Sequence, residues 1–322
     1  EQDRVDFAAG LRGLDGPFSG VEVRAVYGDY EHAELEGDEV GTLFLNEGHE
    51  WRVEATQASM ALFGGELDGS IGVQQRVQDR ESIGAEAFLP EHEVDQWAAF
   101  VVEELHLDGV TVEGGFRFEA TDIDAVGGRR DRQFRTWSAS LGASYEFTRD
   151  MSIALSFSRT ERPPTGEELY SDGAHLATAG FEVGDDALDP ETAWSTELSL
   201  KRRNGPVTGA LNLYRTSFDD FIVPVATGRE MDELPERVYR QADARFVGAE
   251  LDLSWSACDC DFGELVFELG ADAVRGRSLG DALPRIAPRR VRLAGQLRRD
   301  RAELRVEAMH VAGQRRTAPG ET

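Results

Sequence analysis

Hydrophobic and polar residues alternate with period two along most of the chain. In residues 151–158, Met, Ile, Leu and Phe occupy every second position, with Ser or Ala between them. Residues 302–308 repeat the pattern with Glu and Arg at the polar positions. Successive side chains of a β-strand point to opposite faces, so the pattern predicts strands with one apolar and one polar face. Several periodic segments reach about ten residues, the length that a tilted strand needs to cross a bilayer.

The connections between these segments alternate between short and long. The short ones have tight-turn chemistry and are Phe63-Gly64-Gly65, Asp108-Gly109, Arg149-Asp150, Arg203-Asn204-Gly205 and Arg299-Asp300. The long ones are rich in Gly, Pro, Asp and Glu and cover residues 31–40, 81–94, 121–131, 161–188, 223–237 and 275–285. Outer-membrane barrels have short turns on one side and long loops on the other. We therefore predict an all-β fold, an antiparallel transmembrane β-barrel of which this chain supplies about fourteen strands.

The alternation also predicts which side chains face lipid. We expect the apolar set to point outward, namely Phe116, Phe118, Leu155, Phe157, Leu198, Leu200, Leu304 and Val306. We expect the polar set to point into the lumen, namely Glu113, Arg117, Ser156, Glu197, Glu303 and Arg305.

The charge balance is strongly acidic. The 322 residues include 61 Asp and Glu against 34 Lys and Arg, which gives a net charge of -27. Nucleic acid is therefore not an expected partner. Two interpretations of the excess stay open: carboxylates that attract cations to the loops, or solvation of long loops in a salty habitat. No apolar run is long enough for a helical span, and a mean hydropathy of -0.41 is compatible with a barrel wall of alternating residues.

The motifs give no support to enzymatic chemistry. The chain contains no Gly-x-Ser-x-Gly elbow, no phosphate-binding loop and no His-Glu-x-x-His pair, so we predict that it is not an enzyme. Cys258 and Cys260 are the only cysteines and are one residue apart. We expect them in a turn, as an incidental thiol pair, because this spacing does not suit an ordinary framework disulfide or a metal cage.

The longest predicted loop carries a family resemblance. It contains Arg162-Pro-Pro-Thr-Gly-Glu-Glu-Leu-Tyr170, followed by Gly184 and by Leu188-Asp-Pro-Glu191. These residues resemble the barrel signature of TonB-dependent outer-membrane receptors, and the segments 171–178 and 181–184 resemble the zinc-uptake branch of that family. Similar segments occur elsewhere in the chain, namely Glu86–Pro90, Glu103–Leu105, Asn212–Tyr214, Phe218–Ile222 and Gly248–Leu251.

The resemblance implies a receptor of the bacterial outer membrane. Residues 1–322 would form one barrel domain, part of a larger barrel of about 22 strands, with the plug domain, the TonB box and the terminal strands outside this chain. The implied partners are outer-membrane lipid, the TonB–ExbB–ExbD energy-coupling complex acting through the plug, and a metal ion or metal chelate. Zinc would be a transported substrate, and no cofactor is expected.

Four residues are candidate metal ligands, namely His175, Glu86, His92 and Asp172. His175 lies in the segment that resembles the zinc-uptake branch, and neutral imidazole suits Zn²⁺ or Cu²⁺. The loop pattern puts the other three on the same side of the membrane, where carboxylates and imidazole could share a site. The histidine-rich external loop of some zinc receptors is missing. A siderophore, haem or cobalamin receptor and a passive porin or adhesin barrel remain as alternatives.

Overall fold

A computed structural model describes residues 1–37, 39–84, 87–175, 178–261 and 263–318. Within these residues, the secondary structure consists of one short helix, α1 (Gly166–Tyr170), and eighteen strands in a single sheet. Fourteen strands are long: β1 (Gln2–Arg12), β2 (Phe18–Glu36), β3 (Glu39–Gln57), β5 (Gly65–Gly84), β6 (His92–Leu107), β7 (Val110–Ala125), β8 (Arg132–Thr148), β9 (Met151–Arg162), β12 (Glu191–Arg202), β13 (Val207–Met231), β14 (Leu234–Cys260), β15 (Gly263–Ser278), β17 (Arg290–Arg299) and β18 (Ala302–Val311). Four are short: β4 (Met60–Leu62), β10 (Asp172–His175), β11 (Gly180–Val183) and β16 (Asp281–Ala282). The predicted all-β fold is confirmed, and the long strands match the predicted number.

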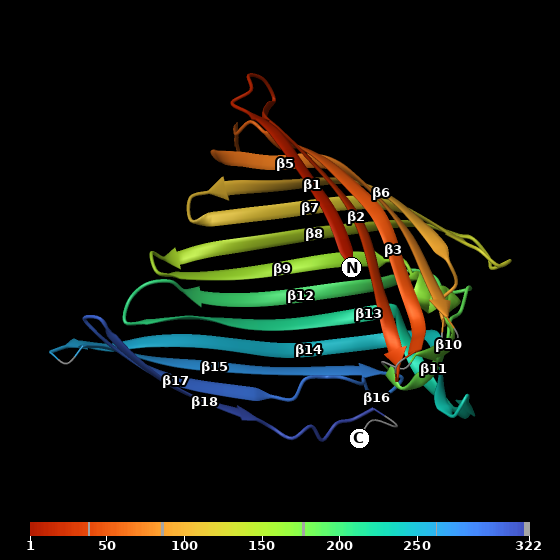
Figure 1. The fold of residues 1–322 in the computed structure, drawn as a ribbon. Coiled ribbons are helices and arrows are strands. Elements are labelled where there is room, and N and C mark those ends of the chain that lie inside the picture. The colour runs from red at the N-terminus through yellow and green to blue at the C-terminus, as the bar shows by residue number, and fades with distance from the viewer. Residues whose placement is uncertain (38, 85–86, 176–177, 262, 319–322) are drawn as a thin grey trace.

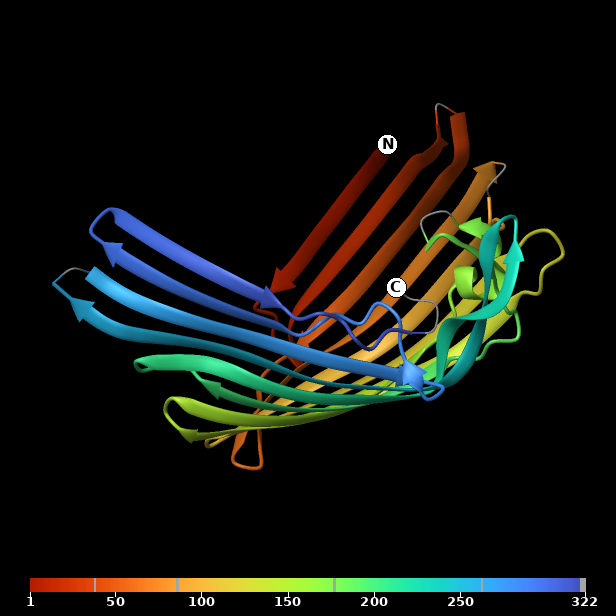
Figure 2. The same ribbon diagram turned by 90° about the horizontal axis from the view of Figure 1, so that it is seen from below.

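The long strands form one antiparallel meander. Each pairs with the next long strand along the chain, from β1–β2 to β17–β18. The sheet curves into an open trough (Figures 1 and 2). Within the described residues, β1 and β18 are not paired with each other. No helix in the described part of the chain has the length and apolar character required to cross a bilayer.

One pairing departs from the meander. β10 and β11 form a small antiparallel hairpin. β11 also pairs in parallel with the first residues of β14, with Phe181 opposite Glu236 and Val183 opposite Val238. Together with α1, this hairpin lies on the concave side of the trough, at the end where the longer connections gather (Figure 2). The longest connection is therefore folded against the wall.

The two faces of the sheet match the predicted alternation. Ile123 and Phe134 pack against Leu169 and Tyr170 of α1, so this face of the sheet is the inner one. Arg117 has the same parity on β7 as Ile123, and it donates to Gln74 on the inner face at 3.2 Å. Phe116 and Phe118 have the opposite parity on β7. All eight residues predicted to point outward are exposed: Phe116, Phe118, Leu155, Phe157, Leu198, Leu200, Leu304 and Val306.

Two predicted long loops are wrong. Residues 31–40 are mostly strand, because β2 continues to Glu36 and β3 begins at Glu39. Residues 223–237 are mostly strand as well, with β13 continuing to Met231 and β14 beginning at Leu234. Long hairpins pair their own backbone groups, so strands can continue beyond the wall even where the composition is typical of loops.

The prediction for the two cysteines is also wrong. Cys258 and Cys260 form a disulfide and lie in the last residues of β14 rather than in a turn. The pairing with β15 shifts register between Ser256 and Cys258. Alternate residues of a strand share one face, and the two Cα atoms are 5.4 Å apart, within the range that a disulfide spans.

Candidate functional site

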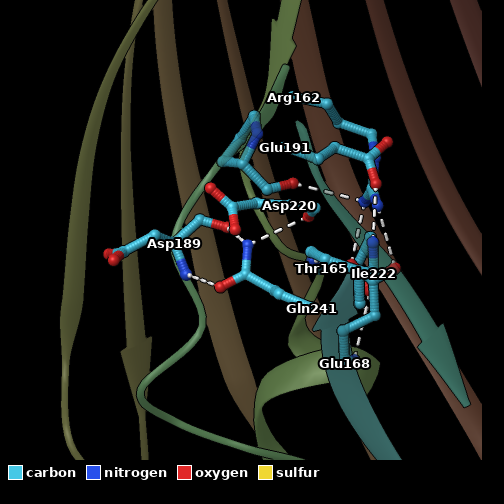
Figure 3. A network of polar contacts seen from close by, with 9 residues as sticks. Arg162, Thr165, Glu168, Asp189, Glu191, Asp220, Ile222 and Gln241 are labelled. Atoms are coloured by element: carbon cyan, nitrogen blue, oxygen red, sulfur yellow. Dashed lines mark hydrogen bonds and ion pairs between the residues drawn. The ribbon is translucent and has the colours of Figure 1, made fainter. Parts of the chain in front are cut away.

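The connection between β9 and β12 forms a compact structure on the concave side of the trough. We call its described residues, 163–175 and 178–190, the rim cap. Arg162, just before the cap, donates from both terminal nitrogens to the Glu168 carboxylate at 2.8 and 2.9 Å. Its Nε donates to Glu191 Oε1 at 2.9 Å. Glu191 Oε2 accepts the backbone N–H of Ile222 at 3.0 Å (Figure 3). These bonds join the ends of β9 and β12 to α1 and β13.

The helix α1 is short, and its start is fixed by local hydrogen bonds. Thr165 Oγ1 accepts the Glu168 N–H at 3.3 Å, and the Glu168 carboxylate accepts the Thr165 N–H at 2.8 Å. This capping box satisfies two backbone donors that a helix start leaves open. The Glu168 carboxylate thus serves the helix cap and the ion pair with Arg162 at the same time.

The other face of α1 is anchored by apolar packing. Leu169 and Tyr170 pack with Leu188, and the same cluster includes Ile123 and Ile222 of the wall. Tyr170 is fully buried, and its hydroxyl donates to the carbonyl of Arg130 at 2.8 Å. Burial raises the pKa of Tyr170 to about 12, so the hydroxyl keeps its proton at physiological pH.

Gln241 of β14 joins the end of the cap to the wall. Its Oε1 accepts the Asp189 N–H at 3.0 Å. Its Nε2 donates to the carbonyls of Asp189 at 2.8 Å and Asp220 at 3.0 Å (Figure 3). One side-chain amide thus satisfies three backbone groups from two segments.

His175 lies in β10, within the rim cap. Its ring stacks on Phe88 at a centroid distance of 4.4 Å, and its Nδ1 is 3.3 Å from Glu182 Oε1. Glu182 is buried and accepts from the Thr178 hydroxyl at 2.7 Å and from the Tyr239 hydroxyl at 2.9 Å. The carboxylate is therefore held in place by two hydroxyl groups, with the imidazole beside it.

The other candidate ligands are not brought to His175 as one group. Asp172 is 3.5 Å from Arg129. His92 is buried, with Nδ1 3.0 Å from the carbonyl of Pro90. Glu86 lies outside the described residues. Among the residues that are described, no three or more His, Cys, Asp or Glu side chains gather as a metal cage. The metal site stays a prediction.

The burial of His92 gives a prediction for Gly166. A Cβ added at Gly166 would lie 2.2 Å from His92 Nε2, and the ring cannot move easily because it is buried and held at Pro90. We expect Gly166→Ala to destabilise the docking of α1 by about 1–3 kcal/mol.

His92→Ala should remove most of that cost in the double variant, because it clears the space that the new methyl group needs. Limited proteolysis of the rim cap measures the effect. If Gly166→Ala and the double variant are cleaved at the same rate, the clash with His92 is not the cause.

The sequence alone did not assign roles to Glu182 and Tyr239. Glu182 was visible only as part of the 181–184 segment, and Tyr239 is 57 residues further along the chain. Their contact depends on the parallel pairing of β11 with β14. No local sequence pattern predicts that pairing. Phe88 lies in the segment Glu86–Pro90, which resembles the receptor family, but the sequence did not assign it a role.

Comparison with known proteins identifies the fold family. A family model described as "TonB dependent receptor-like, beta-barrel" matches residues 5–321. Among solved structures, the copper transporter OprC superposes with a TM-score of 0.81 and 14% identity, covering 98% of this chain and 53% of that chain. The hemophore receptor HasR of Serratia marcescens, solved with its hemophore HasA and heme, gives 0.76 and 14%, covering 97% and 58%. The FrpB iron transporter of Neisseria meningitidis gives 0.70 and 15%, covering 95% and 50%.

The chain thus spans about half the length of these solved structures. At such low identity the structural likeness shows a common fold, and the named neighbours are transporters and receptors rather than enzymes. The family match extends over nearly the whole chain. The chain belongs to the β-barrel family of TonB-dependent receptors, which are proteins of the bacterial outer membrane.

Proposed function

We propose that this chain is the barrel wall of a receptor that takes up a metal cargo, with zinc as the leading candidate. Transport would be driven by the TonB–ExbB–ExbD complex through a plug domain outside this chain. The family assignment supports the receptor class. Two of the similar structures are named as transporters of copper and iron, which favours a metal over other cargo classes.

The observation that supports a bare metal ion is the pairing of His175 with Glu182. A histidine that binds a metal through one nitrogen commonly directs the other nitrogen to a carboxylate, which fixes the tautomer and raises the basicity of the ligand. Nδ1 of His175 is 3.3 Å from the buried Glu182 carboxylate, a charge contact without hydrogen-bond geometry, and the ring is stacked on Phe88. Nε2 is then the metal-binding atom. Other ligands, such as Glu86 or groups of the plug, would complete the site.

Titration of the full-length receptor with Zn²⁺ tests this proposal. We expect His175→Ala to lower zinc affinity at least about tenfold, and Glu182→Gln to lower it by about 10- to 100-fold by removing the partner of Nδ1. His310→Ala is the matched control, because His310 is exposed in β18, away from the cap. Unchanged zinc affinity in both cap variants would show that the site is elsewhere.

A second candidate is a flat metal chelate, such as haem or a ferric siderophore. Aromatic rings form a line from the wall into the cap. His32 stacks on Phe44 at 4.7 Å, Phe44 meets Phe88 edge to face at 6.3 Å, and Phe88 stacks on His175 at 4.4 Å. Such a surface suits a planar ligand. Phe44→Leu should weaken binding of haem or a ferric chelate while leaving zinc binding unchanged, so the same titration separates the two cargo classes.

A further inference from the structure

The outward face of the wall changes from apolar to basic along three adjacent strands. On β13 the outward positions include Leu211 and Leu213, and the next outward residue is Arg215. On β14, read from its turn end, the outward residues run from Trp255 to Val247 and are followed by Arg245. The outward residues of β15 are apolar from Leu265 to Ala273, and Arg275 and Arg277 follow them. We call these four arginines the arginine belt.

The outward direction of the belt follows from strand parity. Ala244, Phe246 and the other members of a second core cluster lie on the inner face, in contact with Leu283. Arg245 lies between Ala244 and Phe246 in sequence and therefore points away from the lumen. Arg277 is its direct partner on β15. Val247, which is 44% exposed, lies between Arg215 and Arg275 in the ladder.

The belt concentrates positive charge without internal compensation. Arg245 and Arg277 are opposite each other on adjacent strands, an arrangement of like charges that destabilises a sheet. All four side chains are exposed, and none forms a hydrogen bond or ion pair with another described residue. By contrast, the outward Arg135 lies 3.5 Å from Asp122, and the outward Arg159 is paired with Glu161.

The belt stands out against a chain with a net charge of -27. Outward positions near the loop end of β5 and β6 carry acidic residues, namely Asp79, Glu93 and Asp95. On β14 the next outward residue beyond the belt is Asp243, and on β13 Ser217 and then Asp219 follow Arg215. Within β13, β14 and β15, the arginine belt therefore lies between the apolar outer surface and acidic residues nearer the loops.

We propose that the arginine belt binds the phosphate groups of lipid headgroups in the outer leaflet. The belt begins where the apolar outer surface ends, which is the level of the headgroups for a barrel in a membrane. Guanidinium groups form paired hydrogen bonds with phosphate oxygens, and a phosphate between Arg245 and Arg277 would relieve their mutual repulsion. Lipid bound there would fix the depth and rotation of this sector of the wall in the membrane.

Native mass spectrometry of the full-length receptor in detergent tests the proposal, with bis-phosphorylated lipid A as the probe. Arg245→Gln/Arg277→Gln should lower the affinity at least about tenfold, since each basic residue near a charged lipid surface contributes appreciably to binding. Arg215→Gln should give a smaller loss in the same direction. The matched control is Arg12→Gln/Arg301→Gln, which removes two exposed arginines from the turn end of the wall and should leave the affinity unchanged.

Two further probes identify the source of the phosphate. Lipid A without phosphate groups should bind the unmodified receptor as weakly as the phosphorylated lipid binds the double variant. Inorganic phosphate at millimolar concentration should not displace the phosphorylated lipid. Equal binding by both lipids, equal binding by the double variant and its control, or displacement by inorganic phosphate would each overturn the proposal.

Discussion

Replacement of Arg162 by Met is expected to release the rim cap from the wall. The Glu168 and Glu191 side chains are only 15% and 9% exposed, and Arg162 is the cation that both contact. Removing one partner of a buried ion pair leaves the other charge uncompensated, which costs more than the pair contributes. Because Arg162 itself is 39% exposed, we expect a loss of roughly 2–3 kcal/mol in the free energy of local opening.

Hydrogen exchange of the full-length receptor measures this opening. Amides of α1, and the Ile222 N–H that is bonded to Glu191, should exchange about 30- to 160-fold faster in the variant. Arg203→Met is the matched control, because its pair with Glu146 is about half exposed on both sides and should contribute little. If the two variants exchange at the same rate in α1, the ion pairs of Arg162 do not hold the cap.

The second prediction concerns the outer face of the wall. Leu155 is 40% exposed on the outward side of β9, within a run of outward apolar residues from Ile153 to Phe157. Leu155→Arg would put a charge against hydrocarbon, and we expect it to destabilise the inserted barrel by about 2–4 kcal/mol. Denaturant titration of the full-length receptor in lipid vesicles measures the change.

Ser156→Arg serves as the control, because Ser156 is the neighbouring residue and points to the lumen side of the same strand. It should change stability by less than about 1 kcal/mol. Equal losses in the two variants would mean that the two faces of β9 do not differ in environment, and the outward assignment would then be incorrect.

The strands of the wall could be predicted from the sequence because they are determined by local features, namely residue alternation and tight turns. The alternation in residues 151–158 fixes strand type and facing directions, and tight turns such as 108–109 fix where strands reverse. The same local logic failed at residues 31–40 and 223–237, where turn-like composition occurs in strands that continue in pairs. It also missed α1, whose five residues are too few for a helical period.

The candidate site was less predictable because its contacts are long-range. The segment from Arg162 to Glu191 was sufficient to suggest the family, but the sequence does not show that Arg162 binds Glu191 across 29 residues. The structure explains the resemblance in physical terms: Arg162, Glu168, Leu169, Tyr170, Leu188 and Glu191 anchor the cap. These motif residues support the cap, whereas His175 and Glu182 are the groups that face one another as a pair.

The parallel pairing of β11 with β14 has a consequence for the order of folding. Residues 180–183 come before β14 in the chain, so β11 must wait until β12, β13 and β14 have joined the growing sheet. Contacts between segments far apart in sequence form late because closing the intervening chain costs entropy. Glu182 therefore meets Tyr239 only after β14 has taken its place beside β13. In any assembly intermediate in which β14 has not joined β13, Glu182 would lack Tyr239 and the candidate site would be incomplete.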